Sequence, residues 1–411
     1  MPTFKQTIRK LAEYAIAKKG ARQSPSQSNF DVHEFPSVQL PGGLWGMFFE
    51  IADEPYVRMP VLADRFKEHR KVYPALKKSA WEERDGHIYM EVSLHADLPV
   101  EFIKSLIDEA YSIVWNKLDK GARLKIELAG QPYDETKLLD RMIEIHDLKQ
   151  FRKEIRKVSR PAILLRTTKS TEAKIPIAAS KIGGQPDLPA NVEWPVYTNG
   201  KPLAFLAQIN LSEITKLGTP IKGLPIDGLL SIFSVWGWLE EGEFDPKTPT
   251  EVGAEQIGWT VILHTPKKVK LERRKTPKTV NFFKSAAVLP TPVLSLPNHR
   301  VEPPLAALGW TEELYDRFDV MQSDFRSLQM GYWLKNSDIF ASHHQLGGYA
   351  LFQQDFPQEV LEKGLAMLVQ IGTDNYSKMV WGDGGELTFY ADAKALAKGR
   401  FERVWGECQG G

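Results

Sequence analysis

The sixteen residues "SKIGGQPDLPANVEWP" (180–195) hold two glycines, three prolines and one tryptophan, a composition that suits neither a helix nor a central strand. Each proline removes a backbone donor and fixes φ, and the glycine pair permits φ values that other residues avoid. Because an indole contributes little to a disordered segment, Trp194 favours order. The stretch therefore predicts an ordered loop built of turns.

Short segments in and after this loop recur later in the chain. The second copies follow the first at 164, 162 and 157 residues, in the same order along the sequence. This collinearity predicts a duplicated half, although short apolar strands can also resemble one another by chance. The matched pairs are "KIGG" (181–184) with "QLGG" (345–348), "FLAQINL" (205–211) with "MLVQIGT" (367–373), and "GLLSIF" (228–233) with "GELTFY" (385–390).

Strand and helix patterns mix before Ser159, including an alternating strand in "HIYMEVSL" (87–94) and long helices after it. Strands, turns and prolines dominate beyond Ser159. We therefore expect an α+β protein whose main domain boundary lies at Ser159–Pro161. A single helix is predicted over 134–158. The predicted parts are an amphipathic helix and linker (1–29), a small α+β domain (30–130), a linking helix (131–159) and a mixed α+β domain with duplicated strands (160–411), with an insert at about 240–284.

Bulk composition excludes several classes of protein. The 53 basic residues balance 52 acidic ones, so overall charge indicates neither a nucleic-acid binder nor a membrane-surface protein. Cys408 is the single cysteine, which excludes an intramolecular disulfide and a cysteine-based zinc cluster and fits a reducing cytosol. No apolar run approaches the roughly 20 residues that span a bilayer. We expect a cytoplasmic protein without membrane association.

The insert separates its charges. "EEGEFDPKTPTE" (240–251) is acidic, whereas "PKKVKLERRKTPKTVNFFK" (266–284) carries eight basic residues and one acidic residue. The basic run suits either a phosphate-contacting patch, with Phe282 and Phe283 available for stacking, or a solvated hairpin beside its acidic neighbour. We expect the second, and no specific nucleic-acid binding.

The second domain resembles the bacterial YwqG-like family, a domain of unknown function, over about residues 160–411. The motifs that carry the resemblance are "KIGGQPDLPANVEWPVYTNGKPLAFLAQINLSEI", "HHQLGGYALFQQD", "MLVQIGTD", "WGDGGELTFYA" and "RVWGECQ". The resemblance implies a mixed α+β fold with repeated strands, similar to the suppressor-of-fused superfamily. It also implies an immunity or interaction role, because relatives in that superfamily have been proposed as toxin-neutralising partners.

Residues 36–120 resemble the YjbR/MmcQ-like domain, an α+β unit, through "EVSLHADLPVEFIKSLIDEAYSIVWNKL". That family name is associated with DNA binding. The segment holds 11 Lys and Arg against 14 Asp and Glu, a net charge of −3. This sign argues against a phosphate-dominated interface.

Few residues suit catalysis. Adjacent His343 and His344 point different ways on a strand, Asp383 fits a hairpin turn in "WGDGG", and Cys408 has no evident base. We expect no cofactor and no metal, and we favour a protein that is not an enzyme. The glycine pairs are expected to leave backbone N–H groups unpaired for a partner. The predicted ligand- or partner-binding residues, arranged around one concave surface, are Lys181, Asp187, Trp194, Gln208, His344, Tyr349 and Asp383.

Two functions follow as expectations. The first is a non-enzymatic binding module with a protein partner, of an immunity type. The second is a small-ligand-binding protein or enzyme with its site between the duplicated halves. A deep cleft with convergent polar groups would favour the second, and a flat aromatic face the first.

Overall fold

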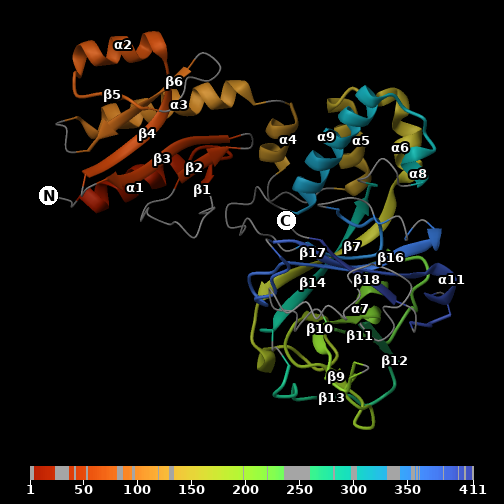
Figure 1. The fold of residues 1–411 in the computed structure, drawn as a ribbon. Coiled ribbons are helices and arrows are strands. Elements are labelled where there is room, and N and C mark those ends of the chain that lie inside the picture. The colour runs from red at the N-terminus through yellow and green to blue at the C-terminus, as the bar shows by residue number, and fades with distance from the viewer. Residues whose placement is uncertain are drawn as a thin grey trace. The chain divides into compact units, whose positions relative to one another are not determined.

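The computed structural model (Figure 1) divides into two compact units, Met1–Asp147 with Ser323–Ile339, and Leu148–Gln322 with Phe340–Gly411. Helix α9, Glu312–Gln329, contributes residues to both units. The predicted domain limits stay predictions. The structure describes residues 4–23, 37–40, 43–51, 54–80, 87–94, 98–118, 120–128, 134–197, 199–219, 221–235, 260–280, 283–297, 303–330, 343–352, 357, 360, 362–382, 384–396, 398–401 and 404–409.

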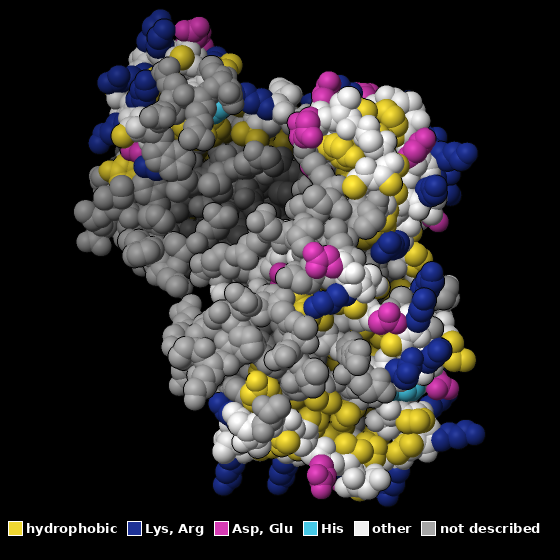
Figure 2. Space-filling model, turned by 45° about the vertical axis from the view of Figure 1, so that its right-hand side comes forward, with side chains coloured by type: hydrophobic (Ala, Val, Ile, Leu, Met, Phe, Trp, Pro, Cys, Tyr) yellow, Lys and Arg dark blue, Asp and Glu magenta, His cyan; other side chains and the backbone are white. Residues whose placement is uncertain are grey.

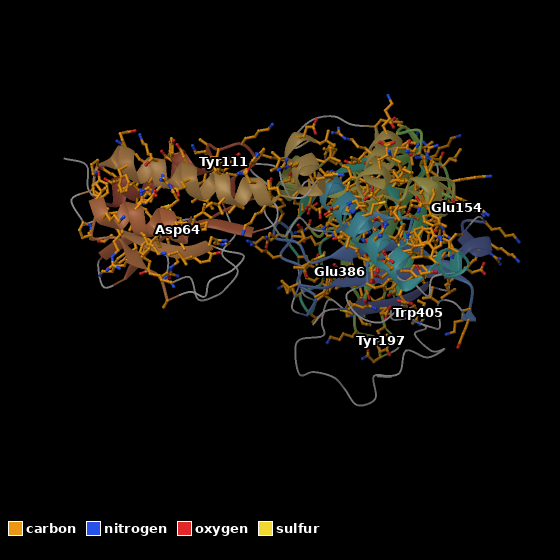
Figure 3. All side chains as sticks on the ribbon, turned by 90° about the horizontal axis from the view of Figure 1, so that it is seen from above. Asp64, Tyr111, Glu154, Tyr197, Glu386 and Trp405 are labelled. Atoms are coloured by element: carbon orange, nitrogen blue, oxygen red, sulfur yellow. The ribbon has the colours of Figure 1, made fainter. Side chains whose placement is uncertain are left out.

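The first unit is a sheet of order β1-β2-β3-β4-β6-β5 with helices packed on it. Helix α1 buries Ile8, Leu11 and Ala15, as its amphipathic pattern predicts. Tyr111 on α3 donates its hydroxyl hydrogen to Lys19 O at 2.9 Å, and Asp64 lies in the first turn of α2 (Figure 3). The elements are α1 Phe4–Ile16, β1 Arg22–Gln23, β2 Ser37–Leu40, β3 Gly43–Ile51, β4 Glu54–Leu62, α2 Ala63–Val72, β5 Lys77–Lys78, β6 His87–Ser93, α3 Val100–Lys117, α4 Lys120–Leu128 and α5 Glu135–Ile145.

The helix predicted over 134–158 is interrupted. α5 ends at Ile145, and α6, Arg152–Val158, follows a 3-10 turn at Lys149–Phe151. Asp147 takes a left-handed φ of 55°, which Asp adopts more readily than most residues and which no α-helix can contain. The prediction of one continuous helix is therefore wrong, because charge and apolar periodicity do not reveal a single residue in this conformation.

The second unit is built on a ten-stranded sheet of order β12-β11-β10-β8-β14-β7-β15-β16-β17-β18. The sheet curls so far that its terminal strands β12 and β18 lie against each other. Apolar side chains from both halves fill the space inside. The elements are β7 Arg160–Lys169, η2 Glu172–Lys174, β8 Lys181–Ile182, β9 Asp187–Leu188, β10 Ala204–Asn210, α7 Leu211–Thr215, β11 Leu229–Ser234, β12 Thr260–Thr265, β13 Glu272–Arg273, β14 Ala286–Ser295, α8 Pro303–Ala306, β15 His344–Leu346, β16 Leu365–Gly372, β17 Glu386–Asp392, α11 Ala393–Leu396 and β18 Val404–Gln409.

Strand register supports the duplication. Lys181 pairs with Gln208 in the first half, and Gln345 pairs with Gln370 in the second. The strand order is symmetric about the β14–β7 pair, and β10 and β16 carry a register shift at matching places, Phe205/Ala207 and Met367/Val369. The two halves are therefore related by a local two-fold axis that passes between β14 and β7.

The glycine pairs have a structural role in both halves. Gly183 and Gly184 have φ of 66° and 78°, and Gly347 and Gly348 have φ of 69° and 80°. Gly183 N–H donates to Leu206 O at 2.7 Å, and its counterpart Gly347 N–H donates to the Leu368 carbonyl at 2.9 Å. The expectation of unpaired N–H groups is wrong at Gly183, Gly184 and Gly347, because the turns direct these donors to main-chain carbonyls.

Among the helices that the structure describes, none has the length and apolar character needed to span a bilayer. The mixed α+β class predicted from the sequence is confirmed.

Candidate functional site

Lys181 begins β8 and is fully buried on the side of the sheet opposite to Ile182. Its ammonium group donates to Glu172 Oε1 at 2.7 Å and to the Gln185 carbonyl. It also lies 3.7 Å from Asp187 Oδ2. A buried lysine is tolerated here because each nearby oxygen accepts a hydrogen or carries a negative charge.

Asp187, in β9, is also fully buried and is surrounded by donors. Its carboxylate accepts from Ala178 N at 2.9 Å, from Gln208 Nε2 at 2.7 Å and from Arg273 Nε at 2.9 Å. Its backbone N–H donates to Gln208 Oε1 at 3.0 Å, so one glutamine holds both the main chain and the side chain of Asp187.

Arg273, in β13, completes the group. It lies 3.0 Å from Glu172 Oε1 through Nε, and it donates to the carbonyls of Glu172 at 2.6 Å and Ile175 at 3.0 Å. We call Glu172, Lys181, Asp187 and Arg273 the buried ion network. Its two positive and two negative charges balance.

The pKa values reflect this balance. Burial lowers the pKa of Lys181, although Glu172 and Asp187 oppose that shift. Burial would raise the pKa of Asp187, but hydrogen bonds from Arg273 and Gln208 hold it below its usual value. The same competition lowers the pKa of Glu172, with the hydrogen bond from Lys181 as the largest opposing effect. The network is therefore a set of mutually neutralised charges.

The ion network belongs to one half only. At the position of Lys181 the second half has Gln345, whose amide donates to Tyr349 O at 2.9 Å as Lys181 donates to Gln185 O. At the position of Asp187 it has Leu351, whose backbone N–H donates to Gln370 Oε1 at 2.9 Å. The same backbone frame is thus held without charged side chains at the described positions of the second half.

In the first half, the segment 266–279, which contains β13, supplies Arg273 to the network. β13 pairs with β9, as Figure 1 shows, and Arg274 NH1 donates to the carbonyls of Pro189 at 3.3 Å and Val192 at 3.1 Å. Together, Arg273 and Arg274 fasten the segment 266–279 to the loop 186–203. We call these two segments the joined loops.

Trp194 lies in the joined loops, partly buried. Its indole N–H donates to Leu203 O at 2.8 Å, and its ring meets Phe233 edge-on with centroids 5.4 Å apart. It fixes the loop to the outer face of β10 and β11 through the apolar cluster that contains Leu188 and Phe205. Trp194 is therefore next to the buried ion network but is not part of it.

His344 and Tyr349 belong to the second half. His344 Nδ1 accepts from Gly372 N at 3.2 Å, so in the neutral ring Nε2 carries the hydrogen, and Nε2 has no hydrogen-bond partner in the described part of the chain. Burial lowers the pKa of His344 to about 4, and Asp374 opposes this shift. The Tyr349 hydroxyl donates to Val158 O at 2.7 Å.

The structure thus brings together Lys181, Asp187 and Gln208 from the predicted set and places His344 and Tyr349 elsewhere in the same unit. Asp383 lies outside the described residues. These side chains are engaged inside the protein and do not form an exposed rim, and their binding role stays a prediction. Within the described ranges no group of three His, Cys, Asp or Glu residues could hold a metal ion.

Sequence reasoning missed Glu172, Arg273 and Arg274 as partners of the loop. A signal was present, since Lys181 and Asp187 are charged in one copy of the repeat while Gln345 and Leu351 are not. A charged residue that appears in one copy of the repeat alone, such as Asp187, needs a partner from outside the repeat. The basic run at 266–284 was the available source of positive charge for it.

The comparisons with known proteins give one match. A family model described as a domain of unknown function (DUF1963) matches residues 180–409. No curated protein matches the chain. The match fits the expected domain of unknown function, whereas the YwqG-like and YjbR-like resemblances stay predictions.

Proposed function

This chain belongs to the DUF1963 family, a domain of unknown function, and from that premise we propose that its second unit is a non-enzymatic interaction module that binds a protein partner through the joined loops. One observation carries the proposal. Arg273 and Arg274 fasten the segment 266–279 to the loop 186–203 through hydrogen bonds to Asp187 and to main-chain carbonyls. A surface that is fixed before binding loses little conformational entropy on association.

The candidate reactive groups support a binding role over bond chemistry. Burial raises the pKa of the Cys408 thiol to about 11, so little thiolate forms near neutral pH. Lys181 and Asp187 are neutralised by each other and by their neighbours, which leaves neither available as a nucleophile or base. The finer form of the proposal, suggested by the YwqG-like resemblance, is an immunity-type protein of the bacterial cytoplasm whose partner is a toxin.

Val196 is the residue with which to test the proposal, because 51% of it is exposed within the joined loops. Ile226 provides a matched control, since it is 75% exposed in the segment between α7 and β11, beyond the opposite end of β10. A partner captured by the wild-type protein is purified and its affinity measured by calorimetry. Val196→Glu should weaken binding about tenfold or more, and Ile226→Glu should leave it unchanged. Equal loss in both variants would contradict the proposal.

The alternative, a small-ligand site or enzyme, has one favouring observation, the buried Nε2 of His344 without a described partner. A thermal-shift screen of metabolites and metals on wild type and His344→Ala separates the two functions. A compound that stabilises wild type alone supports the alternative. The absence of any such compound supports the protein partner.

A further inference from the structure

The joined loops carry a cluster of lysines without described ion pairs. Of the basic side chains in the segment 266–279, Arg273 and Arg274 form hydrogen bonds within the protein, and the others are exposed. Glu193 and Glu272 are the exposed carboxylates of the described joined loops, so positive charge predominates. The exposed lysines are Lys267, Lys268, Lys270, Lys275 and Lys278.

The space-filling view in Figure 2 agrees with this distribution of positive charge. Lys and Arg side chains project from the lower end of the molecule, at the level where Figure 1 places β9 and β13, around an area of hydrophobic side chains (Figure 2). Val196 and Val269, 51% and 40% exposed, are apolar residues of the joined loops. The joined loops therefore combine a positive periphery with apolar contact area.

The clustering has an energetic consequence. Like charges on a short segment repel each other, and the segment 266–279 keeps its position because Arg273 and Arg274 donate hydrogen bonds to Asp187 and to main-chain carbonyls. The fold thus maintains an unneutralised positive surface in a fixed geometry. Such a surface attracts a negatively charged partner and orients it before contact.

Two features favour an acidic protein over a nucleic acid. Proteins that bind nucleic acids combine lysine and arginine contacts to phosphates with arginines that read base edges and aromatic rings on which bases stack. Here both arginines are engaged within the protein, and the Phe283 ring packs against Trp381 with centroids 6.0 Å apart. Lysines beside exposed valines instead suit carboxylates and apolar side chains of another protein.

We infer that the partner of the joined loops is a protein that presents a carboxylate-rich surface to Lys267, Lys268 and Lys270. This inference rests on the proposed function and specifies its partner class. The three lysines make no described ion pair, so reversing their charge removes no internal contact. Their replacement tests the surface without disturbing the buried ion network.

The experiment measures the affinity for fluorescent poly-L-glutamate by anisotropy. The affinity for an oligothymidylate of equal charge, which represents a nucleic-acid partner, is measured for comparison. The test variant is K267E/K268E/K270E. The control variant, K216E/K222E/K394E, makes the same charge change at exposed lysines elsewhere in the second unit. We expect the test variant to bind poly-L-glutamate about tenfold or more weakly and the control to change less than about threefold.

Three results would overturn the inference: no binding of poly-L-glutamate to wild type, equal loss in both variants, or tighter binding of the oligothymidylate. The last would identify a nucleic-acid surface. If the partner that depends on Val196 still binds K267E/K268E/K270E at full affinity, the acidic partner class is wrong while the interaction function stands. Unchanged melting temperatures of both triple variants exclude misfolding as the cause.

Discussion

His344→Asn should change how the stability of the protein depends on pH. Asn keeps an acceptor near the place of Nδ1 for the Gly372 N–H, 3.2 Å away, but cannot be protonated. The pKa of His344 is about 4 in the folded protein against 6.5 for the ordinary group. His344 therefore binds a proton more readily in the unfolded chain. Its contribution to the free energy of unfolding is lost as pH falls from about 6.5 to 4.

The magnitude follows from the shift. A difference of 2.5 pKa units, from 6.5 to about 4, corresponds to about 3 kcal/mol at the acidic limit, and to about 2 kcal/mol at about pH 5. Urea unfolding from neutral pH downward should show the wild type losing this much more free energy of unfolding than His344→Asn. Other titrating groups are common to both proteins and cancel in the difference. Parallel pH profiles would refute the buried, neutral imidazole.

Two further predictions concern particular atoms. Gly183→Ala should destabilise by about 2–5 kcal/mol in urea unfolding, because its new Cβ would lie 2.3 Å from Lys284 O in addition to the left-handed φ. Gly200→Ala, with the same hand of φ and no atom within 4 Å, should lose about 1–2 kcal/mol, and equal losses would argue against the close approach. Cys408, with its pKa raised by burial from 9.0 to about 11, should react with iodoacetamide about a hundredfold more slowly at about pH 8 than in the guanidinium-unfolded chain, and equal rates would show an accessible thiol.

The general architecture could be predicted because it depends on local and repeated patterns. The amphipathic first helix, the alternating strand at His87–Ser93 and the collinear echoes each leave a periodic or repeated trace in the sequence. The duplication was visible because both halves keep the same glycine turn and the same glutamine on the paired strand. The class of the fold followed from these elements.

The candidate site could be predicted only in part. Lys181, Asp187 and Gln208 lie close to one another in sequence and were found together. Arg273 bonds to Asp187 across 86 residues, from a segment whose position depends on the finished fold, so no local pattern assigns it. The same limit applies to the prediction that the binding residues form an exposed surface. Whether a charged side chain is buried depends on the partners that the finished fold brings to it.

The central claim, that Arg273 holds the two segments as one rigid surface, is tested most directly by hydrogen exchange of Arg273→Met. Met keeps an unbranched side chain but removes the guanidinium that bonds Asp187 and three carbonyls. Exchange of the Val192 and Leu203 amides should accelerate about tenfold or more, while the Gly347 amide in the second half keeps its protection. Unchanged protection at Val192 and Leu203, or an equal loss at Gly347, would contradict the account.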